Sequence, residues 1–194
     1  MKRRACVLSA LSLPPLWLLG TAQAEERVAA LLREGGVVLA FRHALAPGTF
    51  DPPQFRVDDC STQRNLNDAG RDQARRMGQW MVQRNLAPAV VRSSPWCRCV
   101  DTANLAFGRA DMWAALGSPR GADEATNAQS LRELRAAVAA AGQQRGRFEV
   151  WVTHQFVLSA LVSTVTSSGE GLVLRAAQGG NDAAPEVLAR LAAA

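Results

Sequence analysis

The sequence predicts a three-layer α/β/α sandwich with a mainly parallel central sheet. Short, nearly continuous apolar runs alternate with helical patterns along the chain, as buried strands and their crossover helices do in such folds. Polar side chains directly follow three of these runs. Because ligands of open α/β sheets bind beyond the carboxyl ends of the strands, this edge is where a site is expected.

The first half of the chain predicts a strand, a loop and a helix in that order. Residues 36–41 form an apolar run after a Gly-Gly break, which is typical of a strand buried on both faces. Residues 46–64 are rich in Pro, Gly, Asp and Gln without periodicity, so we expect a loop. Asn67 is a suitable N-cap for a helix that runs to about Arg84.

The second half repeats the alternation. Residues 89–92 predict a strand, and Ser94-Pro95, a capping residue followed by proline, predicts the start of a helix that ends near Phe107. Residues 108–128 contain scattered Gly, Pro and Asp and predict a surface excursion. The remaining expected elements are helices at 128–141 and 156–165 and strands at 148–153, 172–175 and 187–191, the last two a candidate antiparallel edge.

The N-terminal segment 1–24 resembles a signal peptide. Basic residues 2–4 precede an apolar stretch at 7–19, and Ala22-Gln23-Ala24 places small residues at the cleavage positions, so we expect cleavage after Ala24 and a periplasmic or secreted protein. A transmembrane anchor is the minority alternative, because Pro14-Pro15 interrupts a stretch shorter than the roughly 20 residues that a span needs.

Residues 25–194 are expected to form a single domain. The formal charge of +5 falls to +2 once the three signal-peptide cations are removed. This charge, without basic clusters, gives no support to a nucleic-acid or membrane-surface partner. Every cation after residue 24 is arginine, the side chain suited to forked contacts with phosphate oxygens.

Three cysteines follow the predicted cleavage position. In an oxidising compartment we expect one disulfide, from Cys60 to either Cys97 or Cys99. A zinc site is disfavoured because it lacks a fourth ligand and because Cys-x-Cys is not the usual structural zinc spacing. We therefore expect no metal and no other cofactor.

Four motifs give the chain a family resemblance. They are Phe41-Arg42-His43-Ala44, Leu66-Asn67-Asp68-Ala69-Gly70-Arg71-Asp72-Gln73-Ala74, Ser94-Pro95-Trp96-Cys97-Arg98-Cys99-Val100-Asp101-Thr102-Ala103 and Val152-Thr153-His154. In order and content they resemble the signatures of the histidine phosphatase (phosphoglycerate mutase-like) superfamily, with Ala44 in place of the usual glycine. They lie within residues 36–160, most of the chain that follows the signal peptide.

The resemblance implies roles for the two histidines and two of the arginines. His43 would be the nucleophile, and Arg42, Arg98 and His154 would build the phosphate pocket. The chemistry of these side chains agrees, because a neutral imidazole nitrogen can attack phosphorus to give a phosphohistidine, and guanidinium groups stabilise the charge on the transferring group. The alternative is that each histidine merely satisfies a buried hydrogen bond.

Three neighbouring residues are weaker candidates for binding substrate. Arg64 and Asn65 lie where the 46–64 loop returns, so they either contact substrate or stabilise the loop. Thr153 either donates a hydroxyl hydrogen bond or is simply a β-branched strand residue.

The proton donor to the leaving group has no clear candidate. In the acid-phosphatase branch of the family an aspartate follows the second histidine, but this chain has Gln155, which cannot supply a proton. In the mutase-like branch a glutamate follows the second arginine, and Asp123 and Glu124 fall in a suitable place. The alternative for this pair is a solvated loop charge. Glu170, between two glycines, is expected in a turn.

We therefore expect a metal-independent phosphomonoesterase that works through a phosphohistidine in the periplasm. Small size and an export signal resemble the branch that includes lipopolysaccharide core heptose phosphate phosphatases, so a phosphorylated envelope sugar, as a small molecule or glycolipid, is the preferred substrate. The alternative is a non-catalytic phosphate-binding member of the same fold, for which Ala44 and the missing acid leave room. The sequence does not predict the oligomeric state.

Overall fold

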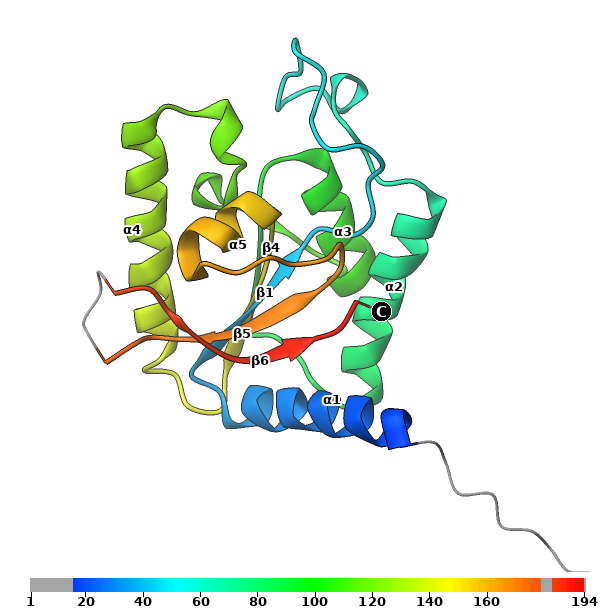
Figure 1. Cartoon of the computed structure of the whole chain (residues 1–194), viewed down its shortest axis with the longest axis vertical. Helices are drawn as coiled ribbons and strands as arrows, with labels where there is room; N and C mark the ends of the chain where they lie inside the picture. The colour runs from blue at the N-terminus through cyan, green and yellow to red at the C-terminus, as the bar shows by residue number, and fades with distance from the viewer. Residues whose placement is uncertain (1–15, 179–182, 194) are drawn as a thin grey trace, which may run out of the picture.

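The computed structural model describes residues 16–178 and 183–193. At its centre lies a six-stranded sheet with the strand order β3-β2-β4-β1-β5-β6, part of which is labelled in Figure 1. The strands are β1 Val37–Arg42, β2 Val90–Ser93, β3 Asp111–Met112, β4 Phe148–Thr153, β5 Gly171–Arg175 and β6 Glu186–Leu191. Strands β1 to β4 pair parallel with one another, whereas β5 pairs antiparallel with both β1 and β6. The predicted mainly parallel sheet with an antiparallel edge is confirmed.

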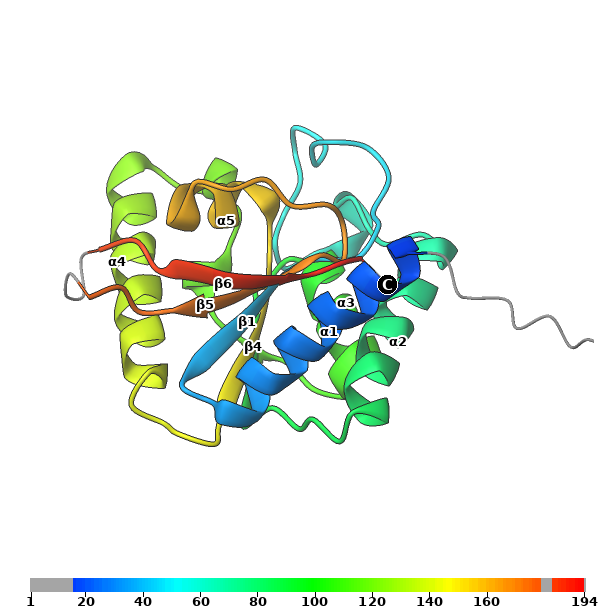
Figure 2. The same cartoon turned by 60° about the horizontal axis from the view of Figure 1, so that its bottom comes forward.

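Helices cover both faces of this sheet (Figure 2). They are α1 Leu16–Glu34, α2 Asp68–Gln83 and α3 Cys97–Phe107 on one face, and α4 Glu124–Ala141 and α5 Gln155–Val162 on the other. The period of two along β1 explains the division, because Leu39 and Phe41 enter the core under α1 to α3 while Val38 and Ala40 enter the core under α4 and α5. The predicted three-layer sandwich is therefore confirmed.

Two helix starts differ from the prediction. The helix expected to open at Ser94 begins at Cys97; the Ser94 hydroxyl accepts the Trp96 N–H at 3.3 Å and also lies 2.8 Å from Nε2 of His154. The helix expected from residue 128 begins at Glu124, four residues earlier, because the Asp123 side chain accepts the backbone N–H of Thr126 and caps it.

The excursion before α4 is more ordered than the sequence suggested. It contains the two-residue strand β3 and two 3-10 turns, η2 Ala114–Leu116 and η3 Pro119–Gly121. Another 3-10 turn, η1 Cys60–Thr62, lies in the 46–64 loop. These turns position loop residues above the carboxyl edge of the sheet.

The first described helix crosses the predicted cleavage position. α1 runs through Ala24 without a break and packs Val28 and Leu32 into the core. Glu25, which would be the first residue after cleavage, binds Arg84 at 2.6 Å and Trp80 Nε1 at 3.1 Å. Residues 1–15 of the predicted signal peptide lie outside the described residues. Within the described part of the chain no helix is long and apolar enough to cross a membrane.

Candidate active site

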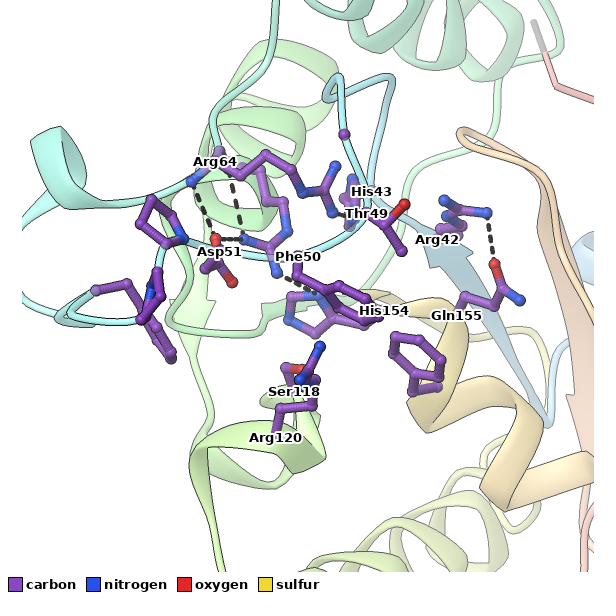
Figure 3. Close-up of a pocket in the computed structure, with 16 residues that line it drawn as sticks. Arg42, His43, Thr49, Phe50, Asp51, Arg64, Ser118, Arg120, His154 and Gln155 are labelled. Carbon is purple, nitrogen blue, oxygen red and sulfur yellow. Dashed lines mark hydrogen bonds and ion pairs between the residues drawn. The ribbon is translucent and has the colours of Figure 1, made fainter.

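A pocket of about 410 Å³ opens above the carboxyl ends of β1, β2 and β4, beneath the 46–64 loop (Figure 3). This size falls within the range of roughly 300–1,000 Å³ that is usual for small-molecule sites. The pocket brings together four of the predicted residues, which end β1, follow β1 or β4, or lie on α3: Arg42, His43, His154 and Arg98. Arg64 also lines it.

His43 is held as a neutral imidazole with one nitrogen free for chemistry. It is 2% exposed, and its Nδ1 lies 2.7 Å from the carbonyl oxygen of Ala44. Because a carbonyl can only accept, Nδ1 carries the proton and Nε2 keeps its lone pair. Burial above all, opposed by the Ala44 hydrogen bond and reinforced by the charges of Arg98, Arg64 and Arg42, lowers the pKa of His43 to about 3. Nε2 is therefore a competent nucleophile at neutral pH.

Three arginines supply positive charge around this nitrogen. Arg42 donates through Nη1 to the Gln155 side chain at 2.8 Å and to the Thr166 carbonyl at 2.7 Å. Arg64 donates to the Ala46 carbonyl and places Nη2 3.5 Å from Nε2 of His43. In Arg42, Arg64 and Arg98 alike, the buried Nε–H has no hydrogen-bond partner among the described residues. Such orphaned donors are expected where an anion binds.

His154 orients Arg98 rather than competing as a second nucleophile. Its Nδ1 accepts from Nη2 of Arg98 at 3.3 Å, and its Nε2 donates to the Ser94 hydroxyl. Burial, with the positive charge of Arg98, lowers the pKa of His154 well below its ordinary value. The two histidine rings meet edge to face with centroids 5.6 Å apart. The sequence-based suggestion that a bound dianion protonates His154 stays a prediction.

Asp51 is a pocket residue that the sequence analysis missed. One of its carboxylate oxygens accepts from Arg98 Nη1 at 2.8 Å and from the Arg64 backbone N–H at 2.9 Å (Figure 3). The pair is buried, with side-chain exposures of 10% for Asp51 and 4% for Arg98. Nothing in the local sequence of the loop, Phe50-Asp51-Pro52-Pro53, distinguishes this acid from a solvated loop charge.

Four other predicted candidates lie outside the pocket lining. Asn65 donates its side-chain amide to the Cys60 carbonyl, which fits the loop-stabilising alternative. The Thr153 hydroxyl donates to the Leu116 carbonyl. Asp123 is the N-cap of α4 and Glu124 begins that helix, so the geometry gives no support to either as the proton donor.

The Cys60–Cys97 disulfide confirms one of the two predicted pairings, and Cys99 is left as a buried thiol. Burial raises the pKa of Cys99 to about 12, so this thiol stays protonated. The bridge joins the 46–64 loop to the first residue of α3, next to Arg98. Within the described residues no group of three or more His, Cys, Asp or Glu side chains is arranged to hold a metal ion.

Ala44 fits its position without strain. It is fully buried, its N–H donates to the Thr102 hydroxyl at 3.1 Å, and it does not have the positive φ that would demand glycine. The replacement of the usual glycine therefore leaves the hydrogen bond to His43 intact.

The mouth of the pocket is aromatic. The rings of Phe50 and Phe156 stack with centroids 6.5 Å apart, and the two residues are 55% and 43% exposed. The guanidinium of Arg120 lies 3.8 Å from the centroid of Phe50. All three side chains line the pocket.

A family model for branch 1 of the histidine phosphatase superfamily matches residues 41–116, a stretch that contains His43 and Arg98. The match covers less than half of the chain and supports a place in the histidine phosphatase superfamily. The match supports a phosphatase and covers the first three motifs, whereas Val152-Thr153-His154 lies beyond it.

Similarity to individual proteins is either confined to a short stretch or low in sequence identity. A 2,3-bisphosphoglycerate-dependent phosphoglycerate mutase of Arthrobacter sp. (strain FB24) is 43% identical over 47 residues, which are 24% of this chain and 19% of the mutase. The protein histidine phosphatase SixA, in a complex with tungstate, is 17% identical with a TM-score of 0.54, over 80% of this chain and 96% of that one.

Two mycobacterial structures give a similar result. Glucosyl-3-phosphoglycerate phosphatase is 16% identical with a TM-score of 0.55, covering 80% of this chain and 98% of its own. The product of open reading frame Rv3214 from Mycobacterium tuberculosis is 15% identical with a TM-score of 0.58, covering 81% and 97%. At these identities the structural matches establish the shared fold.

Proposed function

We propose that this histidine phosphatase is a metal-independent phosphomonoesterase that acts through a phosphohistidine on His43. The observation that carries the proposal is the hydrogen bond from His43 Nδ1 to Ala44, which leaves Nε2 unprotonated within a ring of arginines whose buried Nε–H groups lack partners. Binding alone does not require a nucleophilic nitrogen held in this way.

The chemistry follows from that arrangement. Nε2 of His43 attacks phosphorus while the bond from phosphorus to the leaving oxygen breaks. The arginines Arg42, Arg64 and Arg98 stabilise the charge on the phosphoryl oxygens during transfer. Water then attacks phosphorus, the N–P bond breaks, and inorganic phosphate leaves. The tungstate complex of the SixA structure, a phosphate-like oxyanion in the same fold, is consistent with such a pocket.

The first experiment is hydrolysis of para-nitrophenyl phosphate in EDTA by the parent and by His43→Asn, with Arg132→Ala as a surface control on α4. We expect chelator-resistant turnover in the parent and in Arg132→Ala, and none in folded His43→Asn. Rapid quench with labelled substrate should trap an acid-labile, base-stable phosphoprotein in the parent. Turnover by His43→Asn contradicts the assignment, and a folded parent that binds tungstate without turnover favours the non-catalytic alternative.

A periplasmic setting and an envelope sugar phosphate remain part of the proposal. The Cys60–Cys97 bridge supports an oxidising compartment, and the docking of Glu25 on α2 supports a mature chain that starts there. Expression in a bacterial host with an outer membrane tests both the compartment and the cleavage position. Spheroplast fractionation reports the compartment, and intact-mass measurement reports the first residue of the mature chain. Recovery of the uncleaved chain in the cytoplasm contradicts export.

A further inference from the structure

The proposed mechanism lacks a proton donor for the leaving group, and the pocket contains a carboxylic acid, Asp51. Among the described residues that line the pocket, Asp51 is the one carboxylate. Gln155 holds Arg42 and cannot supply a proton, and Asp123 and Glu124 lie outside the lining. An alkoxide leaving group would therefore depart unprotonated unless Asp51 donates a proton to its oxygen.

The contacts of Asp51 place it beside Arg98, one of the arginines proposed to bind the phosphoryl group. Its Oδ1 shares the guanidinium of Arg98 with His154, which contacts the other terminal nitrogen of that group. Asp51 and His154 therefore contact different terminal nitrogens of the same guanidinium group. The hydrogen bonds that Asp51 accepts from Arg98 and from the Arg64 backbone both end on Oδ1.

We propose that Asp51 is the general acid and base of the reaction, an inference that rests on the proposed function. Phosphoryl oxygens bound to Arg98 would lie next to the Asp51 carboxyl group, which contacts the same guanidinium. As the His43 Nε2–P bond forms and the P–O bond breaks, the Asp51 proton passes to the leaving oxygen and a neutral alcohol departs. The resulting carboxylate then takes a proton from the water that attacks phosphorus, which restores both groups as phosphate leaves.

A purely structural role for Asp51 predicts a different result. If the carboxylate only orients Arg98 and the Arg64 backbone, its loss weakens transition-state binding for every substrate alike. If it donates a proton, its loss matters most for leaving groups that are poor as anions and least for nitrophenolate, which departs without protonation.

The test compares the parent with Asp51→Asn on para-nitrophenyl, phenyl and alkyl phosphates. The amide retains an oxygen that accepts from Arg98 and Arg64 but loses the proton. We expect kcat/KM to fall by about 10²–10⁴-fold for alkyl phosphates, the usual contribution of a general acid, and by less than about 10-fold for para-nitrophenyl phosphate. Asp58→Asn, at an exposed acid of the same loop, is the matched control and should behave as the parent.

A second readout follows the other half of the reaction. Without its base, Asp51→Asn should form the phosphohistidine quickly from para-nitrophenyl phosphate and hydrolyse it slowly, which gives a burst of one nitrophenol per site. A uniform loss across the three substrates, or no loss, overturns the role of Asp51 while leaving His43 in place. A parent that hydrolyses none of them, with His43 intact, overturns the proposed function and the role of Asp51 together.

Discussion

The Cys60–Cys97 bridge should provide a large part of the stability of this domain. It joins residues 37 positions apart. Closing a loop of that length in the unfolded chain corresponds to about 4 kcal/mol in the chain-entropy model. For a domain of this size each kcal/mol shifts the melting temperature by about 2–4 °C. The double variant Cys60→Ser/Cys97→Ser is therefore expected to melt about 8–16 °C below the parent.

The assay is thermal unfolding with and without dithiothreitol. Reductant should lower the melting temperature of the parent and of Cys99→Ala, which keeps the bridge, but should not affect the double variant. Because the bridge ties the loop of Asp51 and Arg64 to the start of α3, the double variant should also lose activity below its melting range. A double variant that melts within about 2 °C of the parent refutes the reasoning.

Three further predictions follow from individual contacts. First, since the pKa of folded His43 is about 3 and unfolded histidine titrates near 6.5, the unfolded chain takes up a proton that the fold excludes. His43 should therefore contribute up to about 1.4 kcal/mol per pH unit to the loss of stability in urea as pH decreases from about 6.5 towards 3, and His154, whose pKa burial also lowers, should add to that loss. In contrast, kcat/KM should show no loss near pH 6.5 from protonation of the nucleophile; a loss there that His43 titration accounts for contradicts its burial. Second, Asp123→Ala should lower the free energy of unfolding by about 1 kcal/mol because it removes the N-cap of α4. Neither Asp123→Ala nor Glu124→Ala should change kcat for para-nitrophenyl phosphate, and a large drop in kcat would restore the substituted residue as a candidate proton donor. Third, Gly70→Ala should destabilise strongly in chemical denaturation, because a Cβ there would lie 1.9 Å from the Leu45 carbonyl oxygen; an unchanged midpoint means that the loop moves freely.

The strands and the residues at their ends were predictable because both depend on local sequence and on sheet geometry. The apolar runs that became β1 and β4 are continuous and buried on both faces, and parallel pairing aligns Arg42 with Thr153 in register. His43 and His154 follow these two strands, so the alignment alone brings them together. Arg98 could be placed for a similar reason, since it lies in the first turn of the helix that follows β2.

Helix starts were less predictable because a capping side chain can find a better partner. Ser94 precedes a proline and has the residue type of an N-cap, yet its hydroxyl binds His154 and the helix begins three residues later. Asp123 is an ordinary loop acid by sequence and became the N-cap of α4. The Ser94–His154 contact depends on tertiary structure that no local pattern encodes, whereas the Asp123 cap is a local hydrogen bond from the Thr126 N–H.

Asp51 could not be found from sequence because nothing local fixes its distance from Arg98. The two residues are 47 positions apart, and the loop that carries Asp51 has no periodicity from which to infer direction. Two nonlocal constraints position it: the Cys60–Cys97 bridge, and the Arg64 backbone, which donates to the same carboxylate oxygen as Arg98. Both constraints place loop residues next to the start of α3, so the disulfide and the ion pair hold the same piece of chain over the phosphate pocket. A chemical role for Asp51 therefore depends on a bridge that forms outside the pocket, and loss of the bridge should affect poor leaving groups more than nitrophenolate.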